Sequence, residues 1–100
     1  MKVRISSDFQ EILSSVIENR LEEILCLRNY LFQKRYEEAK GIAHALKGVL
    51  GSYGFEEAYR MASKVDDDLK EMKYDEARGS ADKLGHYMSR VEIEYIEEEF

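Results

Sequence analysis

The segment AHALKGVLGSYGF, residues 43–55, combines a histidine with a lysine three positions later and glycines four and seven positions later. A neutral imidazole has a free ring nitrogen that can act as a nucleophile. A lysine ammonium one helical turn away can neutralise negative oxygens on a group that the ring carries. His44 and Lys47 are therefore a candidate pair for phosphoryl transfer, which depends mainly on positioning and charge neutralisation.

A helical projection at about 100° per residue places His44 away from the apolar side of its expected helix. That apolar side consists of Ala39, Ala43, Leu46, Leu50 and Tyr53. Lys47 and three glycines, Gly41, Gly48 and Gly51, share the side of His44. Each glycine in a helix interior costs about 0.8 to 1 kcal/mol relative to alanine. We therefore predict that the glycines let a large partner approach the ring closely.

The segment resembles the core motif of histidine phosphotransfer (HPt) domains, which belong to multistep two-component relays. The family motif is a histidine, a variable residue, an aliphatic residue and Lys-Gly, followed by small residues and a glycine-aromatic pair. This chain has His44-Ala45-Leu46-Lys47-Gly48 and then GSYGF at residues 51–55. The segments YEEA (36–39) and YDEA (74–77) stand where such domains begin their second and fourth helices. The resemblance spans about residues 7–95, and Gly41 is less typical of it.

The resemblance implies that His44 is phosphorylated, that Lys47 assists the phosphoryl group and that Gly48 keeps the ring accessible. It implies a phosphoryl carrier rather than an enzyme with its own ATP or metal site. The donor would be the phospho-aspartate of a receiver domain, and a second receiver would accept the group. Response-regulator receivers are thus the expected partners, with a hybrid histidine kinase as a further one. No cofactor is expected on the chain itself, because the receiver would supply the Mg²⁺.

The expected partner surface surrounds His44 and includes parts of the first helix. Its candidate residues are Glu37, Lys40, Gly41, Ala45, Gly48 and Gly51. The alternative interpretation is a helical adaptor that binds a receiver or another signalling partner without being phosphorylated.

Apolar residues at helical spacing predict an all-α fold, an antiparallel up-down four-helix bundle. The first helix is expected over about 7–32, with a capping box from Ser7 and Gln10, and the second over about 36–53, with Gly54 as a left-handed cap. The third is expected to begin at Phe55, and Asp75 is expected to cap the fourth. The predicted inward residues outside the second helix are Phe9, Leu13, Val16, Leu21, Ile24, Leu27 and Leu31, then Phe55, Ala58, Ala62, Val65, Leu69 and Met72, then Ala77, Ala81, Leu84, Met88, Val91 and Tyr95.

Length and composition predict one domain, and the extent of the resemblance implies a stand-alone module. The chain has 100 residues and no proline, and we divide it into a tail (1–6), a phosphotransfer domain (7–98) and a second tail (99–100). The formal net charge of -6 disfavours nucleic acid and anionic membranes as partners. A single cysteine, no signal-peptide pattern and no apolar run of about 20 residues predict a cytoplasmic protein, and the expected phosphorelay carrier is a monomer.

Other residues that could do chemistry receive ordinary structural interpretations. His86 has Ser89 and Arg90 one turn away instead of glycines, which favours a surface histidine. Cys26 lies between leucines and is expected to be buried or half-buried. The triplet 66–68, DDD, is expected to be a solvated helix face and not a metal site. The glycines at 48, 51 and 54 lack the spacing of a nucleotide-binding loop.

Overall fold

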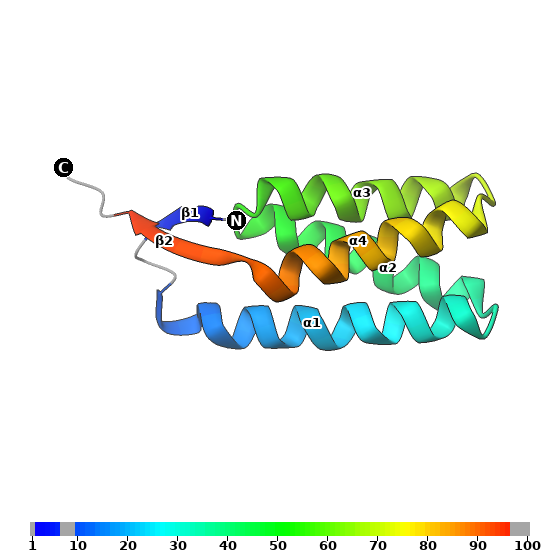
Figure 1. Cartoon of the computed structure of the whole chain (residues 1–100), viewed down its shortest axis with the longest axis horizontal. Helices are drawn as coiled ribbons and strands as arrows, with labels where there is room; N and C mark the ends of the chain where they lie inside the picture. The colour runs from blue at the N-terminus through cyan, green and yellow to red at the C-terminus, as the bar shows by residue number, and fades with distance from the viewer. Residues whose placement is uncertain (1, 7–9, 97–100) are drawn as a thin grey trace.

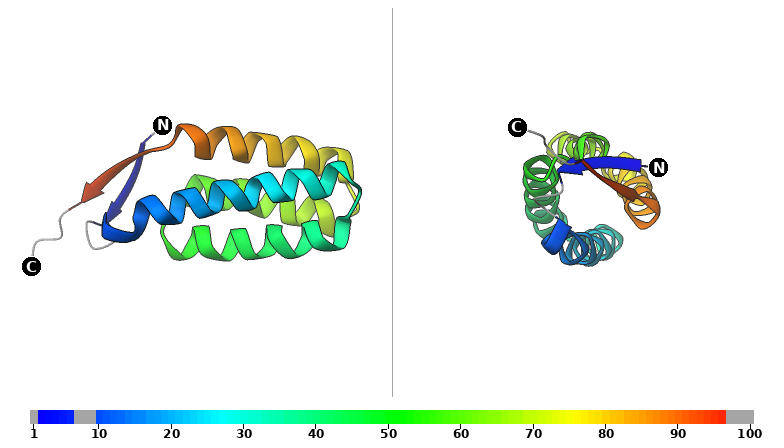
Figure 2. Two further views of the ribbon diagram at one scale, coloured as in Figure 1. Left: turned by 90° about the horizontal axis from the view of Figure 1, so that it is seen from below. Right: turned by 90° about the vertical axis from the view of Figure 1, so that its left-hand side faces the viewer.

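The computed structural model describes residues 2–6 and 10–96, and the side chains of residues 14–91. This part of the chain forms four helices: α1 (Gln10–Phe32), α2 (Tyr36–Ser52), α3 (Glu56–Lys70) and α4 (Tyr74–Arg90). The short connections make neighbouring helices antiparallel, as Figure 1 shows. Each helix packs against the next and α4 returns to α1, so that the four surround one core (Figure 2). The predicted four-helix bundle is confirmed.

The core contains most of the residues that helical spacing assigned to it. Leu46 and Leu50 of α2, Val65 and Leu69 of α3 and Leu84 of α4 are fully buried. Burying one such aliphatic side chain contributes about 1.5 to 3 kcal/mol relative to exposing it, and packing of this kind supplies most of the stability of a helix in a protein. Phe9 lies outside the described residues, as does the side chain of Leu13.

All three connections between helices end the preceding helix in the same way. After α2, Gly54 has φ +82°, and Phe55 N donates a 3.0 Å hydrogen bond to the carbonyl of Leu50. This geometry is a Schellman motif, in which a left-handed residue lets the chain satisfy the last carbonyls. Lys34 and Met72 take the equivalent left-handed positions after α1 and α3, with φ 59° and 58°. The predicted cap at Gly54 is confirmed.

Two expectations about side chains in the last two helices are wrong. Met72 was assigned to the inward stripe of the third helix, but it follows the end of α3 and is 71 % exposed. Asp75 was expected to cap the fourth helix, yet it lies within the first turn and Lys73 occupies the N-cap position. The expected capping residue of the first helix, Ser7, lies outside the described residues, and α1 begins at Gln10.

The ends of the chain form a small sheet that the periodicity did not indicate. Strand β1 (Lys2–Ser6) pairs in parallel with β2 (Glu92–Ile96), with Lys2 opposite Glu92 and Arg4 opposite Glu94. The sheet extends beyond one end of the bundle (Figure 1). The predicted continuation of the fourth helix to Tyr95 is therefore wrong, because α4 ends at Arg90 and Tyr95 belongs to β2. The N-terminal segment 2–6 is a strand.

Candidate functional site

His44 lies on the outer surface of α2, as the helical projection predicted. Its side chain is 73 % exposed. The helix buries its opposite side through Ala39, Ala43, Leu46 and Leu50, and this fixes the direction in which the imidazole leaves the bundle. The ring nitrogen Nδ1 lies 3.6 Å from Oδ2 of Asp66 on α3. Because Nδ1 faces the protein, Nε2 on the far edge of the ring is the nitrogen available to a partner.

Asp66 is a residue of the candidate site that sequence reasoning missed. Only 2 % of the residue is exposed, so its assignment to a solvated helix face is wrong, and the same holds for Asp68 at 4 %. A usable signal was present in the spacing. Asp66 lies four residues after Ala62 and three before Leu69, which places it on the inward stripe of α3. A carboxylate at such a position requires partners, because a buried charge is costly unless it is paired.

The partners of Asp66 are cationic groups at the surface. Its Oδ2 lies 3.0 Å from Nζ of Lys70 and 3.9 Å from Nζ of Lys47. The contact with Asp66, through its hydrogen-bonding geometry and then its charge, raises the pKa of Lys70 above its usual value. One buried oxygen thus gathers His44, Lys47 and Lys70, and the two lysines place positive charge beside the imidazole.

The three glycines on the histidine side have different surroundings. Among the described residues, nothing lies within 4 Å of a Cβ built at Gly41 or Gly48. Their surfaces are open, as the access argument requires. Gly51 differs, since a Cβ there would lie 3.0 Å from Cδ2 of Tyr59. A side chain of α3 thus already occupies the space beside Gly51, and the assignment of Gly51 to the partner surface stays a prediction.

The remaining residues of the expected partner surface lie along the exposed side of α2. Glu37 and Lys40 form a surface ion pair at 3.3 Å, and Ala45 is exposed beside His44. Their assignment to a docking surface stays a prediction.

Two other reactive side chains lie apart from this site. His86 of α4 is exposed, as expected for a surface histidine. Cys26 of α1 is exposed as well, which contradicts the expectation that it is buried or half-buried. Its position on α1 points it away from the core despite its leucine neighbours, since Leu25 is also 57 % exposed whereas Leu27 is buried.

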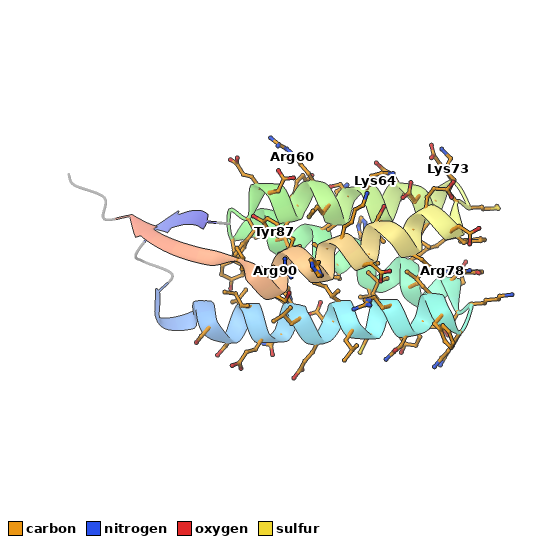
Figure 3. The ribbon with its side chains drawn as sticks, in the orientation of Figure 1. Arg60, Lys64, Lys73, Arg78, Tyr87 and Arg90 are labelled. Carbon is orange, nitrogen blue, oxygen red and sulfur yellow. The ribbon has the colours of Figure 1, made fainter. Side chains whose placement is uncertain are left out.

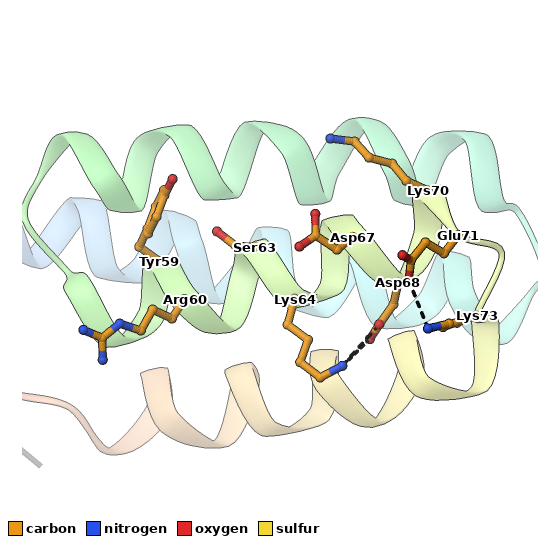
Figure 4. A pocket seen from close by; sticks show the side chains of 9 residues that line it. All are labelled: Tyr59, Arg60, Ser63, Lys64, Asp67, Asp68, Lys70, Glu71 and Lys73. Carbon is orange, nitrogen blue, oxygen red and sulfur yellow. Dashed lines mark hydrogen bonds and ion pairs between the residues drawn. The ribbon is translucent and has the colours of Figure 1, made fainter.

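The charged outer side of α3 provides no second site of comparable organisation. Figure 3 shows Arg60, Lys64 and Lys73 on the surface of the bundle. An open hollow there is lined by Tyr59, Arg60, Ser63, Lys64, Asp67, Asp68, Lys70, Glu71 and Lys73 (Figure 4). Its cations are already engaged, for example Lys64 with Asp68 and Lys73 with Glu71. Within the described residues, no group of three or more histidine, cysteine or acidic side chains could hold a metal ion.

Comparison of the chain with protein-family models, curated proteins and solved structures finds no match. No helix in the described part of the chain is long and apolar enough to cross a membrane.

Proposed function

We propose that this protein is a histidine phosphotransfer protein that carries a phosphoryl group on His44. It accepts the group from the phospho-aspartate of a receiver domain and passes it to another receiver. The single observation that supports this most directly is the exposed imidazole, whose Nδ1 lies 3.6 Å from the buried carboxylate of Asp66. The sequence resemblance to the HPt motif points in the same direction.

The transfer step assigns a distinct role to each of these groups. The lone pair of Nε2 attacks phosphorus, and the P–O bond to the receiver's aspartate breaks with its electron pair remaining on that carboxylate. His44 then holds the phosphoryl group on Nε2 while Nδ1 keeps its proton, so the ring becomes positively charged. The carboxylate of Asp66, 3.6 Å from Nδ1, stabilises that charge and electrostatically favours the tautomer in which Nδ1 carries the proton and Nε2 is the nucleophile.

Lys47 and Lys70 supply the positive charge that the phosphoryl oxygens need. Both ammonium groups lie within 4 Å of the same Asp66 oxygen, so both are close to the ring. Phosphoryl transfer passes through a state with charge spread over three equatorial oxygens, which cations stabilise. The Mg²⁺ and the acidic residues of the reaction would come from the receiver. A reducing cytoplasmic setting suits this role.

The test is transfer of labelled phosphate from a phosphorylated receiver, in the presence of Mg²⁺, to the wild-type chain and to His44→Gln. We expect label on the wild type and none on His44→Gln. His86→Gln is the matched control, because it removes the other exposed histidine and should be labelled like the wild type. Base-stable, acid-labile label on His44→Gln would contradict the assignment of His44.

The same experiment separates the carrier from the adaptor. A folded wild-type chain that takes no label from a broad panel of receivers, yet binds one of them equally well after His44→Ala, would replace the carrier with the adaptor.

A further inference from the structure

At Gly51, the aromatic ring of Tyr59 from α3 packs against the backbone of α2. The Cδ2 and Cε2 atoms of Tyr59 lie 3.0 Å and 3.2 Å from where a Cβ of residue 51 would be. The ring itself is not buried, because Tyr59 is 39 % exposed. A side chain at position 51 would move the ring by a few tenths of an ångström or more. The absence of a Cβ at position 51 therefore allows the Tyr59 ring to lie this close to α2.

The ring lies next to the ammonium group of Lys47. Nζ of Lys47 is 5.9 Å from the centroid of the Tyr59 ring and 3.9 Å from Oδ2 of Asp66. The side chain of Lys47 is only 28 % exposed, so these neighbours limit the conformations that a flexible lysine can adopt. A cation within about 6 Å of an aromatic face is attracted by the ring quadrupole. Tyr59 and Asp66 thus hold Lys47 from two directions.

We propose that Tyr59 is a positioning residue that holds the Lys47 ammonium where it meets the phosphoryl group on His44, and that Gly51 is present to seat the ring. The proposal rests on the proposed function of His44. It assigns Gly51 an internal role, in contrast to Gly41 and Gly48, whose surfaces are open among the described residues. Tyr59 acts through Lys47 and need not touch the phosphoryl group.

The first test observes Lys47 directly and does not depend on phosphorylation. A ring near a lysine side chain shifts its methylene resonances, so NMR of the Lys47 ε-protons reports the contact. We expect a ring-current shift in the wild type and in Tyr59→Phe, and its loss in Tyr59→Leu. An unchanged Lys47 shift in Tyr59→Leu would show that the ring does not hold the ammonium group.

The second test measures transfer from a phosphorylated receiver to His44. Tyr59→Leu should slow transfer about two- to fivefold, the range expected for a solvent-accessible cation–π contact. Tyr59→Phe should restore the wild-type rate, because the ring and not the hydroxyl makes the contact. Tyr30→Leu is the matched control: it removes a ring whose cationic partner is Arg35, at 5.0 Å, and should leave the rate unchanged.

A double variant distinguishes positioning from a general effect on the bundle. In a Lys47→Gln background, Tyr59→Leu should cause no further loss of rate. An equal loss in both backgrounds would overturn the proposal, because Tyr59 would then act independently of Lys47. If the wild-type chain takes no label at all, the phosphotransfer function fails, and the NMR measurement still decides whether Tyr59 positions Lys47.

Gly51→Ala tests whether the missing side chain at position 51 is what lets the Tyr59 ring lie beside Lys47. The alanine should displace the ring, reduce the Lys47 shift and slow transfer by up to the same two- to fivefold. Gly79→Ala on α4 is the matched control, because nothing described lies within 4 Å of its Cβ. Both alanines should favour the helix, so slower transfer in Gly51→Ala alone would separate the effect from stability. Equal transfer rates in the two variants would remove the role of Gly51.

Discussion

Asp66 and Asp68 are both buried carboxylates of α3, two residues apart, but their surroundings differ in kind. Asp68 accepts a hydrogen bond of 3.0 Å from the buried Ser80 hydroxyl of α4 and two of 3.2 Å from Lys64. The partners of Asp66 are instead an exposed imidazole and two lysines. The first arrangement ties two helices together, whereas the second concentrates charge at a surface.

The spacing along α3 explains how one helix supports both arrangements. Residues two positions apart point about 200° apart around a helix, so the two carboxylates flank the core on opposite sides. Asp66 contacts residues of α2 and Asp68 contacts α4. In Figure 4, Tyr59 and Lys70 extend to the α2 side of α3, while Lys64 reaches Asp68 on the α4 side. The comparison predicts that one carboxylate serves stability and the other serves transfer.

Removing the two carboxylates separately is the strongest way to break this comparison. Asp66→Ala should slow phosphoryl transfer roughly 10- to 100-fold, because the imidazole loses the group that orients it. Asp68→Ala should leave transfer within about twofold of the wild type, but destabilise the bundle by about 1 to 3 kcal/mol, since the buried Ser80 hydroxyl loses its acceptor. Transfer rates and urea unfolding measure the two effects. Similar transfer rates in both variants would refute the division of roles.

Asp66→Asn separates orientation from charge at the same position. The amide keeps an oxygen that can accept from Nδ1 but lacks the negative charge. We expect transfer faster than in Asp66→Ala and slower than in the wild type, because the charged ring of phosphorylated His44 loses its counter-charge. A rate equal to that of Asp66→Ala would mean that the charge alone matters.

The lysines provide a matched pair for a smaller effect. Lys70 contacts Asp66 at 3.0 Å and Lys64 contacts Asp68 at 3.2 Å, and both side chains are largely exposed. Lys70→Gln should shorten the lifetime of phosphorylated His44 about two- to fivefold, the size expected for one charge-assisted contact near solvent. Lys64→Gln should leave that lifetime unchanged. Loss of label over time measures both, and an equal change in both variants would count against a role for Lys70.

Ser80, which contacts Asp68, and His44, which contacts Asp66, should differ in their effect on the free energy of unfolding. Ser80→Ala removes a buried hydrogen bond and should lower the free energy of unfolding by about 1 kcal/mol. His44→Ala removes a ring that is 73 % exposed and should change it by less than about 0.5 kcal/mol. Urea unfolding of both variants checks the difference. A larger loss for His44→Ala would show that the imidazole is part of the bundle's internal bonding.

The helices, their order and the outward direction of His44 were predictable from sequence because they depend on local periodicity. The apolar stripes of α2, α3 and α4 each repeat every three to four residues, and burial follows them closely. The surroundings of His44 were not predictable in this way. Asp66 and Tyr59 come from another helix, and their effect on His44, Lys47 and Gly51 depends on how α3 is rotated against α2.

Other errors have the same physical origin. The charge of three consecutive aspartates predicted a solvent-exposed helix face. Two of the three instead flank the core-facing side of α3 and have partners on other helices. The pairing of β1 with β2 joins segments at opposite ends of the chain, and short strands of this kind lack the long periodic pattern that identified the helices. Local patterns thus predicted the framework, while non-local packing determined the chemistry of the site.

The smallest expected effect is a change in the unfolding free energy at alkaline pH. It tests whether the charge of Asp66 holds the Lys70 ammonium group. Contact with Asp66, through hydrogen bonding and then charge, raises the pKa of Lys70 above its usual 10.5. A pKa that is higher in the folded state than in the unfolded state means that folding is favoured by the protonated form. This contribution is complete below about pH 10.5 and is lost as the pH rises through the folded-state pKa. The difference in unfolding free energy between the wild type and Lys70→Gln should therefore shrink above pH 10.5.

The difference in unfolding free energy between the wild type and Lys70→Gln isolates the contribution of Lys70 from those of other groups that titrate in the same pH range. Burial, with a smaller contribution from Glu57, raises the pKa of Tyr87, and the contact with Glu71 raises that of Lys73. Both groups are present in each chain, so their contributions cancel. In an Asp66→Asn background, Lys70→Gln should give a much smaller pH-dependent difference, because only the weaker contribution of Asp67 then raises the pKa of Lys70. A difference as large as in the wild-type background would show that Asp66 is not the main partner of Lys70 and would remove Lys70 from the cluster around His44.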